Sequence, residues 1–293
     1  MSEPKDLTKL FESHRSHLRA VAYRMLGSAS EADDAVQEAW LRLNSSNPSE
    51  VANLGGWLTT VVSRVCLDML RSRRSRPEEA LDAEVVEPIA DTKSDPEQEA
   101  LLADSVGVAL LVVLETLSPA ERVAFVLHDV FDLPFDEIAP IVDRTPDAAR
   151  QLASRARRRV RGGEITSNSD LQSQRVVVDA FLAALRAGDF EGMLAVLDPD
   201  VVVRMDAVPG VPGAPREFRG AANWARGATA AFSRFARFVH PAVVNGAVGL
   251  VYAPGGRLSR ALSFTFANGR IVRAEIISDR DRLQQLDLSV LDD

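Results

Sequence analysis

Apolar residues recur at intervals of three and four through residues 5–75, the spacing of amphipathic helices that pack along one face. We expect the first helix to end at Gly27, because glycine readily adopts the left-handed conformation that closes a helix. Ser30 is the expected cap of a second helix over residues 31–43, and a third helix is expected over residues 57–74. The first part of the chain is therefore predicted to be a helical domain.

Residues 132–161 have the pattern of a helix-turn-helix. A short amphipathic segment precedes a turn at residues 143–146, and a longer helix follows over residues 146–161. Thr145 is the expected N-cap of that helix, and Pro146 suits its first position, where a backbone N–H is not needed. The first helix is expected to bury an apolar face formed by Phe135, Ile138, Ala139 and Ile141.

The pattern changes in the C-terminal part of the chain. One helix is predicted over residues 174–197, followed by segments in which apolar and polar residues alternate, as in strands with one buried face. Residues 220–233 have helical spacing between strands, and Asn268-Gly269 has the sequence of a tight hairpin turn. A short helix is expected near the end of the chain. These elements predict an α+β domain, a curved antiparallel sheet wrapped by helices.

Size and composition limit the class of protein. The 293 residues suggest two domains, and the 46% of hydrophobic residues suffices for packed cores. Mean hydropathy is −0.04 and no long apolar run is present, so we expect no membrane span, and the polar N-terminus predicts no secretory signal. Cys66 is the one cysteine, which excludes an intramolecular disulfide and a cysteine metal cluster. The composition therefore predicts a cytoplasmic protein with no metal and no cofactor.

The distribution of charge points to nucleic acid. The chain has a formal net charge of −8 and a pI of about 5.2, yet its arginines gather on the predicted helices over residues 57–74 and 146–161. Such a local concentration in an acidic protein suggests a DNA-binding surface. The alternative is a solvated basic face whose arginines pair with acids within the fold. In a helix-turn-helix, the start of the second helix reaches base edges and later basic residues contact phosphates. The corresponding positions are Asp147, Ala148, Arg150 and Gln151 for bases, and Arg155, Arg158 and Arg159 for phosphates.

Three segments, in this order, resemble the extracytoplasmic-function group of the sigma-70 family, in the form that bears a C-terminal SnoaL-like extension. Residues 31–43 (EADDAVQEAWLRL) are similar to the helix that docks on the clamp helices of the RNA polymerase β′ subunit. Residues 55–76 are similar to the segment that reads and melts the −10 element, and residues 118–160 to the domain that reads the −35 element. The resemblance covers nearly the whole chain. It implies two all-α helical sigma domains, the second with a helix-turn-helix, followed by an α+β SnoaL-like cone.

The resemblance also implies partners and residue roles. The partners are core RNA polymerase, through its β and β′ subunits, and promoter DNA, with no membrane involved. The polymerase contact is expected at Asp33, Asp34, Gln37 and Glu38, with Trp40 packed beneath them. The −10 contact is expected at Trp57, Arg64, Asp68, Arg71, Arg73 and Arg74. The −35 contact is expected at Thr145, Asp147, Ala148, Arg150, Gln151, Arg155 and Arg158.

By the same resemblance the chain divides into five parts. They are a region 2 domain, an acidic linker that enters the nucleic-acid channels of the polymerase, a region 4 domain, a second linker and a SnoaL-like regulatory domain. These parts are predicted at residues 5–76, 77–97, 98–162, 163–170 and 171–293.

The extension is expected to regulate the sigma domains, since family members that carry it usually lack a separate anti-sigma factor. Two of its motifs are altered here: Asp-Gly-Gly-Gly-basic becomes Asp-Ala-Val-Pro-Gly from Asp206, and Asn-Pro-Asp-Lys-Leu becomes Asp-Arg-Asp-Arg-Leu. Many members also have asparagine at the position of Arg64. A pocket in this domain is a candidate site for a small-molecule ligand. The regulatory residues are expected to be Asp206, Asp281, Arg282 and Leu283.

Three functions remain open on the sequence. The first is a transcription initiation factor that does no covalent chemistry. The second is an ordinary helix-turn-helix regulator with a ligand-binding domain, which would bind its operator as a dimer without polymerase. That account leaves the acidic helix over residues 31–43 without a role. The third is a SnoaL-like enzyme with a helical appendage, in which His240 and Asp206 are the titratable candidates. The arginine distribution counts against an enzyme, and His240 is alternatively a strand-end residue beside Pro241.

Overall fold

The computed structural model describes residues 4–45, 53–75, 107–161, 168–206 and 216–291. The acidic linker predicted at residues 77–97 lies outside the described residues. The described residues fall into two compact units. Unit 1 contains those up to residue 107 together with residues 117–157, and unit 2 contains residues 108–116 and those from 158 onward. Within these ranges, no helix is long and apolar enough to cross a membrane.

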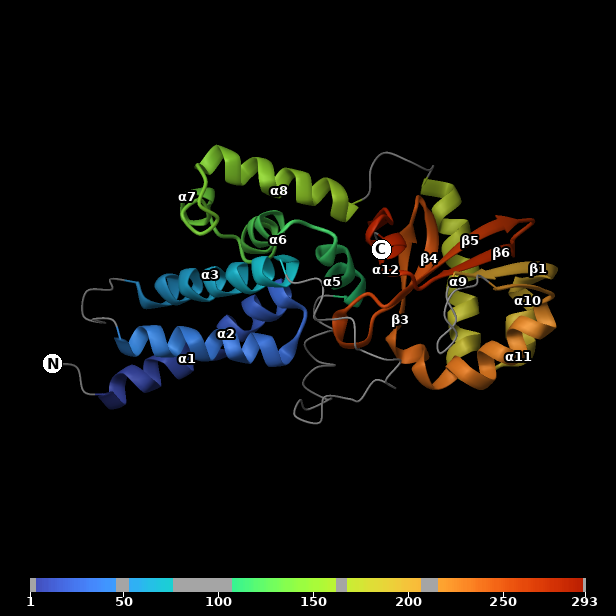
Figure 1. The fold of residues 1–293 in the computed structure, drawn as a ribbon, viewed down its shortest axis with the longest axis horizontal. Helices are drawn as coiled ribbons and strands as arrows, with labels where there is room; N and C mark the ends of the chain where they lie inside the picture. Colours follow the sequence, from blue (N-terminus) through green and yellow to red (C-terminus); the bar gives the residue numbers. More distant parts are fainter. Residues whose placement is uncertain (1–3, 46–52, 76–106, 162–167, 207–215, 292–293) are drawn as a thin grey trace. The chain divides into compact units, whose positions relative to one another are not determined.

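The first part of unit 1 consists of three helices that pack side by side (Figure 1). Its N-terminal helix ends, as predicted, at Gly27, whose φ is 72° and whose N–H donates to the carbonyl oxygen of Tyr23. The cap of the next helix is Ser28, whose hydroxyl accepts from the N–H of Glu31. The predicted cap Ser30 is wrong, because the helix begins at residue 29 and Ser30 lies inside it. The helices are α1 (Pro4–Leu26), α2 (Ala29–Ser45) and α3 (Leu54–Ser75).

The second part of unit 1 contains the predicted helix-turn-helix. Its elements are α6 (Pro119–Phe125), the π-helical turn η3 (Val126–Val130), α7 (Phe135–Ile138) and α8 (Pro146–Arg161), whose last turn, from residue 158, is counted with unit 2. Ser118 caps α6 in a capping box with Glu121, in which each side chain accepts from the other residue's backbone N–H. In the turn between α7 and α8, Asp143 has a φ of 56°. Thr145 accepts a hydrogen bond from the N–H of Ala148, so its predicted role as the cap of α8 is confirmed.

The two parts of unit 1 share a packed interface. α3 packs against α6, and α1 against η3. Arg122 of α6 is buried, with 6% of its surface exposed, and its Nη1 donates to the carbonyl oxygen of Met25 in α1 at 3.0 Å. The ring of Phe131 lies edge-on to that of His17, with centroids 5.4 Å apart. A buried polar contact therefore adds to the apolar packing between the parts.

Unit 2 is built on a seven-stranded sheet. Its strands are β1 (Leu197–Met205), β2 (Arg216–Arg219), β3 (Val239–Val244), β4 (Ala247–Tyr252), β5 (Arg260–Ala267), β6 (Arg270–Ile277) and β7 (Leu288–Ser289). The order across the sheet is β2-β1-β6-β5-β4-β3-β7. The prediction of a purely antiparallel sheet is wrong at one pair, because β1 and β6 run parallel. These two strands are distant in sequence, so no hairpin fixes their relative direction.

Two Asn-Gly pairs form the tight turns of the sheet. Asn268 and Gly269 have φ values of 53° and 72°, both positive as a type I′ turn requires, and they join β5 to β6 as predicted. Asn245 and Gly246 have φ values of 51° and 81°. This second turn divides one predicted alternating segment into β3 and β4.

The helices of unit 2 are α5 (Val108–Glu115), α9 (Asn168–Ala187), α10 (Phe190–Val196), α11 (Ala221–Phe232) and α12 (Arg280–Gln284), with 3-10 turns η4 (Ser233–Phe238) and η5 (Pro254–Gly256). The single helix predicted over residues 174–197 is two helices. Gly188 has a φ of 65°, and the carboxylate of Asp189 then caps α10 by accepting from the N–H of Gly192. The α11 helix confirms the prediction for residues 220–233.

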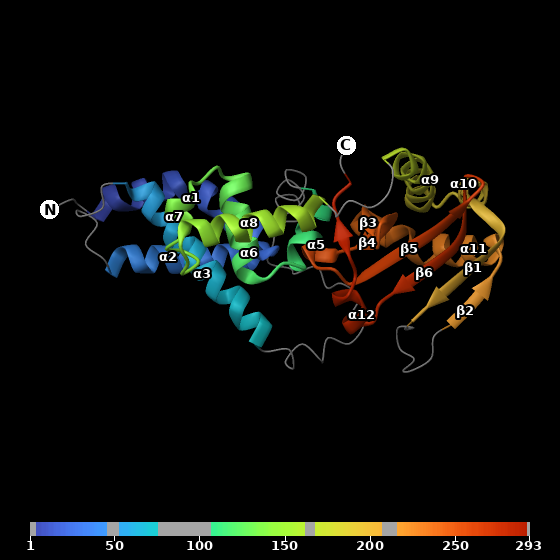
Figure 2. The same cartoon turned by 90° about the horizontal axis from the view of Figure 1, so that it is seen from above.

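Different helices cover the two faces of the sheet. α9, α10 and α11 cover one face, over a core cluster that includes Phe181, Trp224 and Phe264. α9 and α12 lie on opposite sides of the sheet (Figure 2). On the α12 side, Leu283 packs with Ala261 and Ile277. The predicted class, all-α followed by α+β, is confirmed.

The α5 helix belongs to unit 2, although the predicted region 4 domain over residues 98–162 includes it. It packs against β3 and β7, and the carboxylate of Glu115 accepts from the N–H of Leu258 at 3.0 Å. Its buried residues Leu111, Val112, Val113 and Leu114 form a nearly continuous apolar run. Such a run is hydrophobic all round, so its pattern alone could not indicate which domain it joins.

Candidate nucleic-acid interface

The exposed face of α8 carries most of the residues predicted to contact the −35 element. Ala149, Ala153 and Ala156 bury the opposite face in the core. Helical spacing then gathers on the exposed side Asp147, Arg150, Gln151, Arg155 and Arg158. Ala148 is half-buried beside this face, and Thr145 is exposed at its start with its hydroxyl engaged in the N-cap.

Local partners hold two of the arginines on this face. Arg150 Nη1 lies 2.6 Å from the carboxylate of Asp147, and the guanidinium lies over the ring of Phe135, 5.3 Å from its centroid. Arg155 Nε lies 3.5 Å from the carboxylate of Glu121. Because the Arg150–Asp147 pair is exposed, it is weak, and the guanidinium is free to exchange it for a bidentate contact with a base.

Two successive arginines of α8 have different surroundings. Arg157 donates to the carboxylate of Asp129 at 2.7 Å, and this hydrogen bond raises the pKa of Arg157. Arg158 is exposed and has no partner among the described residues. Arg157 therefore serves the fold, whereas Arg158 is available to a ligand.

The arginines in the middle of α3 contact the helix-turn-helix. Arg64 Nη2 donates to the carbonyl oxygen of Pro140 at 3.0 Å. Arg71 lies 3.7 Å from the carboxylate of Asp143 in the turn before α8, and 3.8 Å from that of Asp68. Asp68 is itself exposed. Two of the predicted −10 residues of α3 thus contact the segment that precedes α8 in the predicted −35 motif.

Arg73 links α3 to the first two helices. Its Nε donates to the carboxylate of Glu31 at 3.0 Å, its Nη1 to the carbonyl oxygen of Leu26 at 3.1 Å, and its Nη2 forms a second contact with Glu31. Trp57 is half-buried in the first turn of α3. The side chain of Arg74 lies outside the described residues.

The predicted polymerase contact lies on α2. Asp34 and Gln37 are exposed, and the half-buried Glu38 lies beside them. Asp33 is turned toward α1, where its carboxylate lies 2.8 Å from Arg19 Nε. Asp33 is nevertheless exposed, and Glu38 is itself paired, its carboxylate 2.9 Å from Arg42 Nε. All four predicted residues therefore lie on one acidic side of α2.

Two large apolar side chains border this acidic face. Trp40 packs against Phe11, with ring centroids 4.8 Å apart, in line with the packing role expected for it. Leu41 is 55% exposed, and its spacing of seven from Asp34 and four from Gln37 puts it on the same side of the helix. The sequence interpretation missed Leu41, although that spacing was the signal that could have found it.

Two of the four residues predicted to be regulatory, Asp206 and Arg282, meet beyond the ends of β1 and β6. The carboxylate of Asp206 accepts from the N–H groups of Ser278 and Asp279, at 2.8 and 3.3 Å, and lies 3.2 Å from Arg282 Nη1. Arg282 also donates to Glu275 at 2.8 Å, and this hydrogen bond raises the pKa of Arg282.

The next residue, Leu283, is buried against Ala261 and Ile277, whereas Asp281 is exposed and has no partner among the described residues. Asp206 and Arg282 therefore connect α12 to the ends of β1 and β6 by polar contacts, and Leu283 connects it to the sheet by apolar packing.

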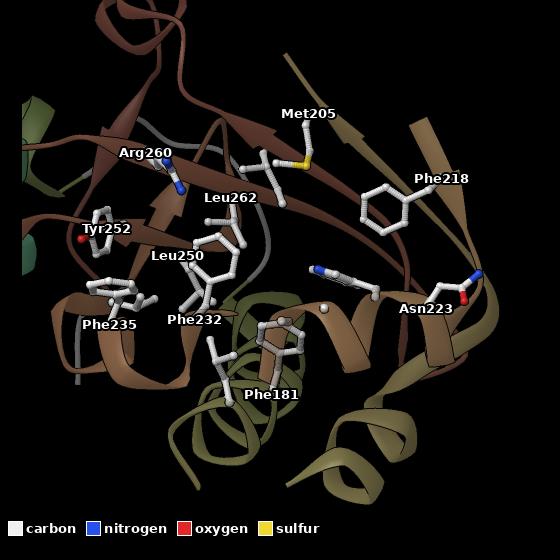
Figure 3. A pocket seen from close by; sticks show the side chains of 16 residues that line it. Phe181, Met205, Phe218, Asn223, Phe232, Phe235, Leu250, Tyr252, Arg260 and Leu262 are labelled. Atoms are coloured by element: carbon white, nitrogen blue, oxygen red, sulfur yellow. The ribbon is translucent and has the colours of Figure 1, made fainter. Parts of the chain in front are cut away.

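A pocket of about 240 Å³ lies between the sheet and the helices α9 and α11 (Figure 3). Arg260 is the charged side chain among the described residues that line it, and most of the others are apolar. The aromatic residues of the lining are Phe181, Phe218, Trp224, Phe232, Phe235 and Tyr252.

The two candidates for catalysis do not meet at this pocket. Val239 lines it, and successive residues of a strand point to opposite faces, so His240 points away from it. Burial, with a smaller effect of the nearby Arg186, lowers the pKa of His240 to about 4, so the ring is neutral at pH 7. Asp206 is absent from the lining and its carboxylate is engaged as described above.

Metal-binding groups and a reactive thiol are the next candidates for a chemical site. Those ranges contain no group of three histidine, cysteine or acidic side chains placed to hold a metal ion. Cys66 is fully buried in α3, and burial raises the pKa of its thiol, which keeps the thiol protonated.

Two family models match the helical part of the chain. The model described as Sigma-70 region 2 matches residues 10–76, and the model described as Sigma-70, region 4 matches residues 107–160.

Curated relatives and a solved structure extend this similarity. The chain is 39% identical over 219 residues to the probable ECF RNA polymerase sigma factor SigI of Mycobacterium tuberculosis (strain CDC 1551 / Oshkosh), covering 72% of this chain and 73% of SigI. It is 42% identical over 200 residues to the ECF RNA polymerase sigma factor SigJ of Mycobacterium tuberculosis (strain ATCC 25618 / H37Rv), covering 67% of this chain and 64% of SigJ. The crystal structure of the Mycobacterium tuberculosis extracytoplasmic function sigma factor SigJ matches with a TM-score of 0.47 and 34% identity, over 94% of this chain and 97% of that one.

Proposed function

Because the chain belongs to the extracytoplasmic-function family of RNA polymerase sigma factors, we propose that it binds core RNA polymerase and directs initiation at promoters selected by α3 and α8. It does no covalent chemistry of its own, and it acts in the cytoplasm with the polymerase. The observation that carries the proposal is that unit 1 presents both an exposed basic face on α8 and an exposed acidic face on α2.

The docking surface is the acidic face of α2. Asp34, Gln37 and Glu38 supply charge and hydrogen-bond acceptors, and the exposed Leu41 supplies an apolar contact at the same face. Large apolar side chains within a polar rim are typical of protein–protein interfaces. The polymerase partner surface is therefore expected to be basic around an apolar centre.

Promoter recognition at −35 is assigned to α8. Arg150 is positioned near the start of the helix for a bidentate contact with guanine, and Gln151 for adenine. Arg155 and Arg158, one and two turns further on, are suited to phosphates.

Recognition at −10 is assigned to α3, and it requires a change within unit 1. Arg64 and Arg71 contact Pro140 and Asp143 of the helix-turn-helix in the structure. These contacts occupy groups that would bind the −10 strand. We infer that they break when polymerase and promoter DNA bind.

The C-terminal domain of unit 2 is proposed to regulate initiation in place of a separate anti-sigma factor, with its pocket as a small-molecule site. The contacts of Asp206 with Arg282 and with the N–H groups of Ser278 and Asp279 support a fixed connection of α12 to the sheet. Arg282→Gln is expected to change transcript yield with full-length protein. An unchanged yield would remove this cluster from the regulatory account.

Run-off transcription tests the main proposal. The full-length chain is added to core RNA polymerase on the DNA upstream of its own gene, and specific transcripts are expected. Asp34→Arg with Glu38→Arg is expected to abolish both polymerase binding and transcription. A matched control reverses two exposed charges of unit 2, Glu191→Arg with Asp200→Arg, and is expected to leave both intact.

The rival functions give different results in the same experiment. An ordinary helix-turn-helix regulator would bind this DNA without polymerase and would be indifferent to the α2 double variant. Retained polymerase binding by that variant would mean that the docking helix is misassigned. An enzyme would need His240 and Asp206 at one site, and the orientation of His240 away from the pocket counts against it.

A further inference from the structure

The pocket of unit 2 has an apolar floor formed by one row of side chains across the sheet. The strand registers pair Leu250 with Leu262, Leu262 with Ile276, and Ile276 with Met205. All four residues line the pocket, so four adjacent strands contribute one side chain each. The rings of Phe181 and Phe232 lie opposite this row (Figure 3). The body of a bound molecule must therefore be apolar.

The next position along the same face breaks this apolar character. Arg260 of β5 pairs with Tyr252 of β4, directly beyond the Leu250–Leu262 pair. The Arg260 side chain lies at the end of the pocket near Tyr252 and Phe232 (Figure 3). Its guanidinium carbon is 5.8 Å from the ring centroid of Phe232. The pocket thus has one cationic end.

Arg260 has no acidic partner among the described residues, and no acid is found among the residues that line the pocket. Burial lowers the pKa of Arg260, because its positive charge is partly removed from water without a carboxylate to compensate. The pocket therefore has positive charge at one end, and no carboxylate among its lining residues neutralises that charge.

We propose that this pocket binds a small apolar carboxylate, whose anionic oxygens pair with Arg260 and whose apolar body lies along the Leu250–Leu262–Ile276 row. The proposal names the ligand class for the regulatory pocket and in that respect rests on the proposed function. A guanidinium suits a carboxylate because it donates two parallel hydrogen bonds in a fixed geometry. The volume of about 240 Å³ lies below the usual range for drug-sized ligands, which limits the body to a short chain or a fused aromatic ring pair.

Calorimetric titration of the full-length chain, without polymerase or DNA, tests the binding. The probes are octanoate and naphthalene-2-carboxylate, each compared with its alcohol, and octylamine as the cationic analogue. We expect saturable binding of at least one carboxylate, about ten- to a hundredfold tighter than its alcohol. Absence of saturable binding by both carboxylates, or equal affinity for acid and alcohol, would overturn the proposal.

Three variants localise the binding. Arg260→Gln is expected to remove the preference for acid over alcohol, and Arg260→Lys to keep part of it. Arg270→Gln, at an exposed position outside the pocket, is the matched control and is expected to bind as the unaltered chain does. If the Arg260→Gln variant still binds the carboxylate more tightly than the alcohol, a group other than Arg260 recognises the carboxylate.

Filling the pocket provides an independent check that does not alter the charge. A Cβ added at Gly227 of α11 meets no atom within 4 Å, so the helix tolerates a side chain there. Gly227→Leu is expected to abolish binding of acids and alcohols alike while raising helix propensity. Unchanged binding by this variant would place the ligand outside the pocket.

Run-off transcription with and without the bound carboxylate separates the two proposals. A change in yield that Arg260→Gln removes supports a ligand-regulated factor. Binding without any change in yield leaves the ligand site established and overturns its regulatory role. Binding by a chain that fails to initiate at all would refute the sigma function and not the site.

Discussion

The two arginine-rich helices, α3 and α8, have similar charge, but their arginines differ in how many contacts they make with the rest of the fold. On α3, Arg64 and Arg73 donate to backbone carbonyl groups and to the carboxylate of Glu31. On α8, Arg150 and Arg158 lie on an exposed face, and the one acid near Arg150 comes from its own helix. Arg157 and Arg155 of α8 also reach acids of other elements, Asp129 and Glu121. The same residue type thus joins elements at some positions of these helices and faces solvent at others, most clearly at Arg158.

This difference separates two uses of arginine. A guanidinium that reaches a carbonyl group of another element orders the fold, and its removal leaves buried acceptors without donors. A guanidinium on an exposed helix face contributes little to stability and is available to DNA. Substitutions in matched pairs can therefore test which use applies at each position.

The largest expected effect is on stability at α3. Arg73→Ala removes the contacts with Glu31 and Leu26, and we expect the free energy of unfolding to fall by about 2.5 kcal/mol, because charge-assisted hydrogen bonds between half-buried groups are lost. Arg158→Ala, on the exposed face of α8, is the matched control and is expected to change it by less than about 0.5 kcal/mol. Urea denaturation followed by far-ultraviolet circular dichroism measures both. Equal falls in the free energy of unfolding for the two variants would contradict the assignment of a structural role to Arg73 and not to Arg158.

The next effect is on promoter specificity at α8. Arg150→Ala is expected to cost about 2 kcal/mol of binding and to relax the preference at a single −35 position, because a bidentate contact with one base is lost. Competition binding of holoenzyme to promoters with each base at that position measures it. An unchanged base preference would contradict the assignment of Arg150 as a base reader.

A smaller effect distinguishes neighbouring arginines of α8. Arg158→Ala is expected to weaken DNA binding equally for all sequences and to lower the salt dependence of log K by about one, the value for one phosphate contact. Arg157→Ala is the control, since Arg157 is already paired with Asp129, and the salt dependence should stay the same. Binding isotherms at four salt concentrations supply both slopes.

The smallest effect concerns the contact between α3 and the helix-turn-helix. Asp143→Asn removes the exposed ion pair with Arg71 and keeps a residue type that tolerates the positive φ of 56° at this position. We expect the free energy of unfolding to change by less than about 0.5 kcal/mol. A fall in the free energy of unfolding of several times that amount would mean that the Arg71–Asp143 pair stabilises unit 1 strongly. Such a pair would oppose the separation of α3 from the helix-turn-helix that −10 binding requires.

The sequence predicted the elements of the fold better than their partners. The helix end at Gly27, the cap at Thr145 and the hairpin at Asn268-Gly269 are all confirmed. The N-cap of α2 was predicted wrongly because two nearby residues, Ser28 and Ser30, can both cap a helix, and the structure uses Ser28.

At the candidate site, too, the sequence predicted local positions better than contacts between elements. Helical spacing correctly gathered Arg150, Gln151, Arg155 and Arg158 on one exposed face of α8. It could not indicate that Asp33 pairs with α1, because that contact joins residues fourteen positions apart. The family resemblance predicted a pocket in this domain, but the sequence did not indicate which residues line it or that Arg260 lies at one end, since strands from across unit 2 build it.

The sequence by itself determined most of the helices and several of the turns, because those depend on the conformations that single residues and near neighbours favour. It also determined the family, through segments that keep their order along the chain. Only the tertiary structure decided which arginines form hydrogen bonds or ion pairs with other elements of the fold. The contact of Arg64 with Pro140 joins positions 76 apart, and that of Arg73 with Glu31 joins positions 42 apart. Such contacts depend on how whole helices pack, and local preferences do not encode that packing.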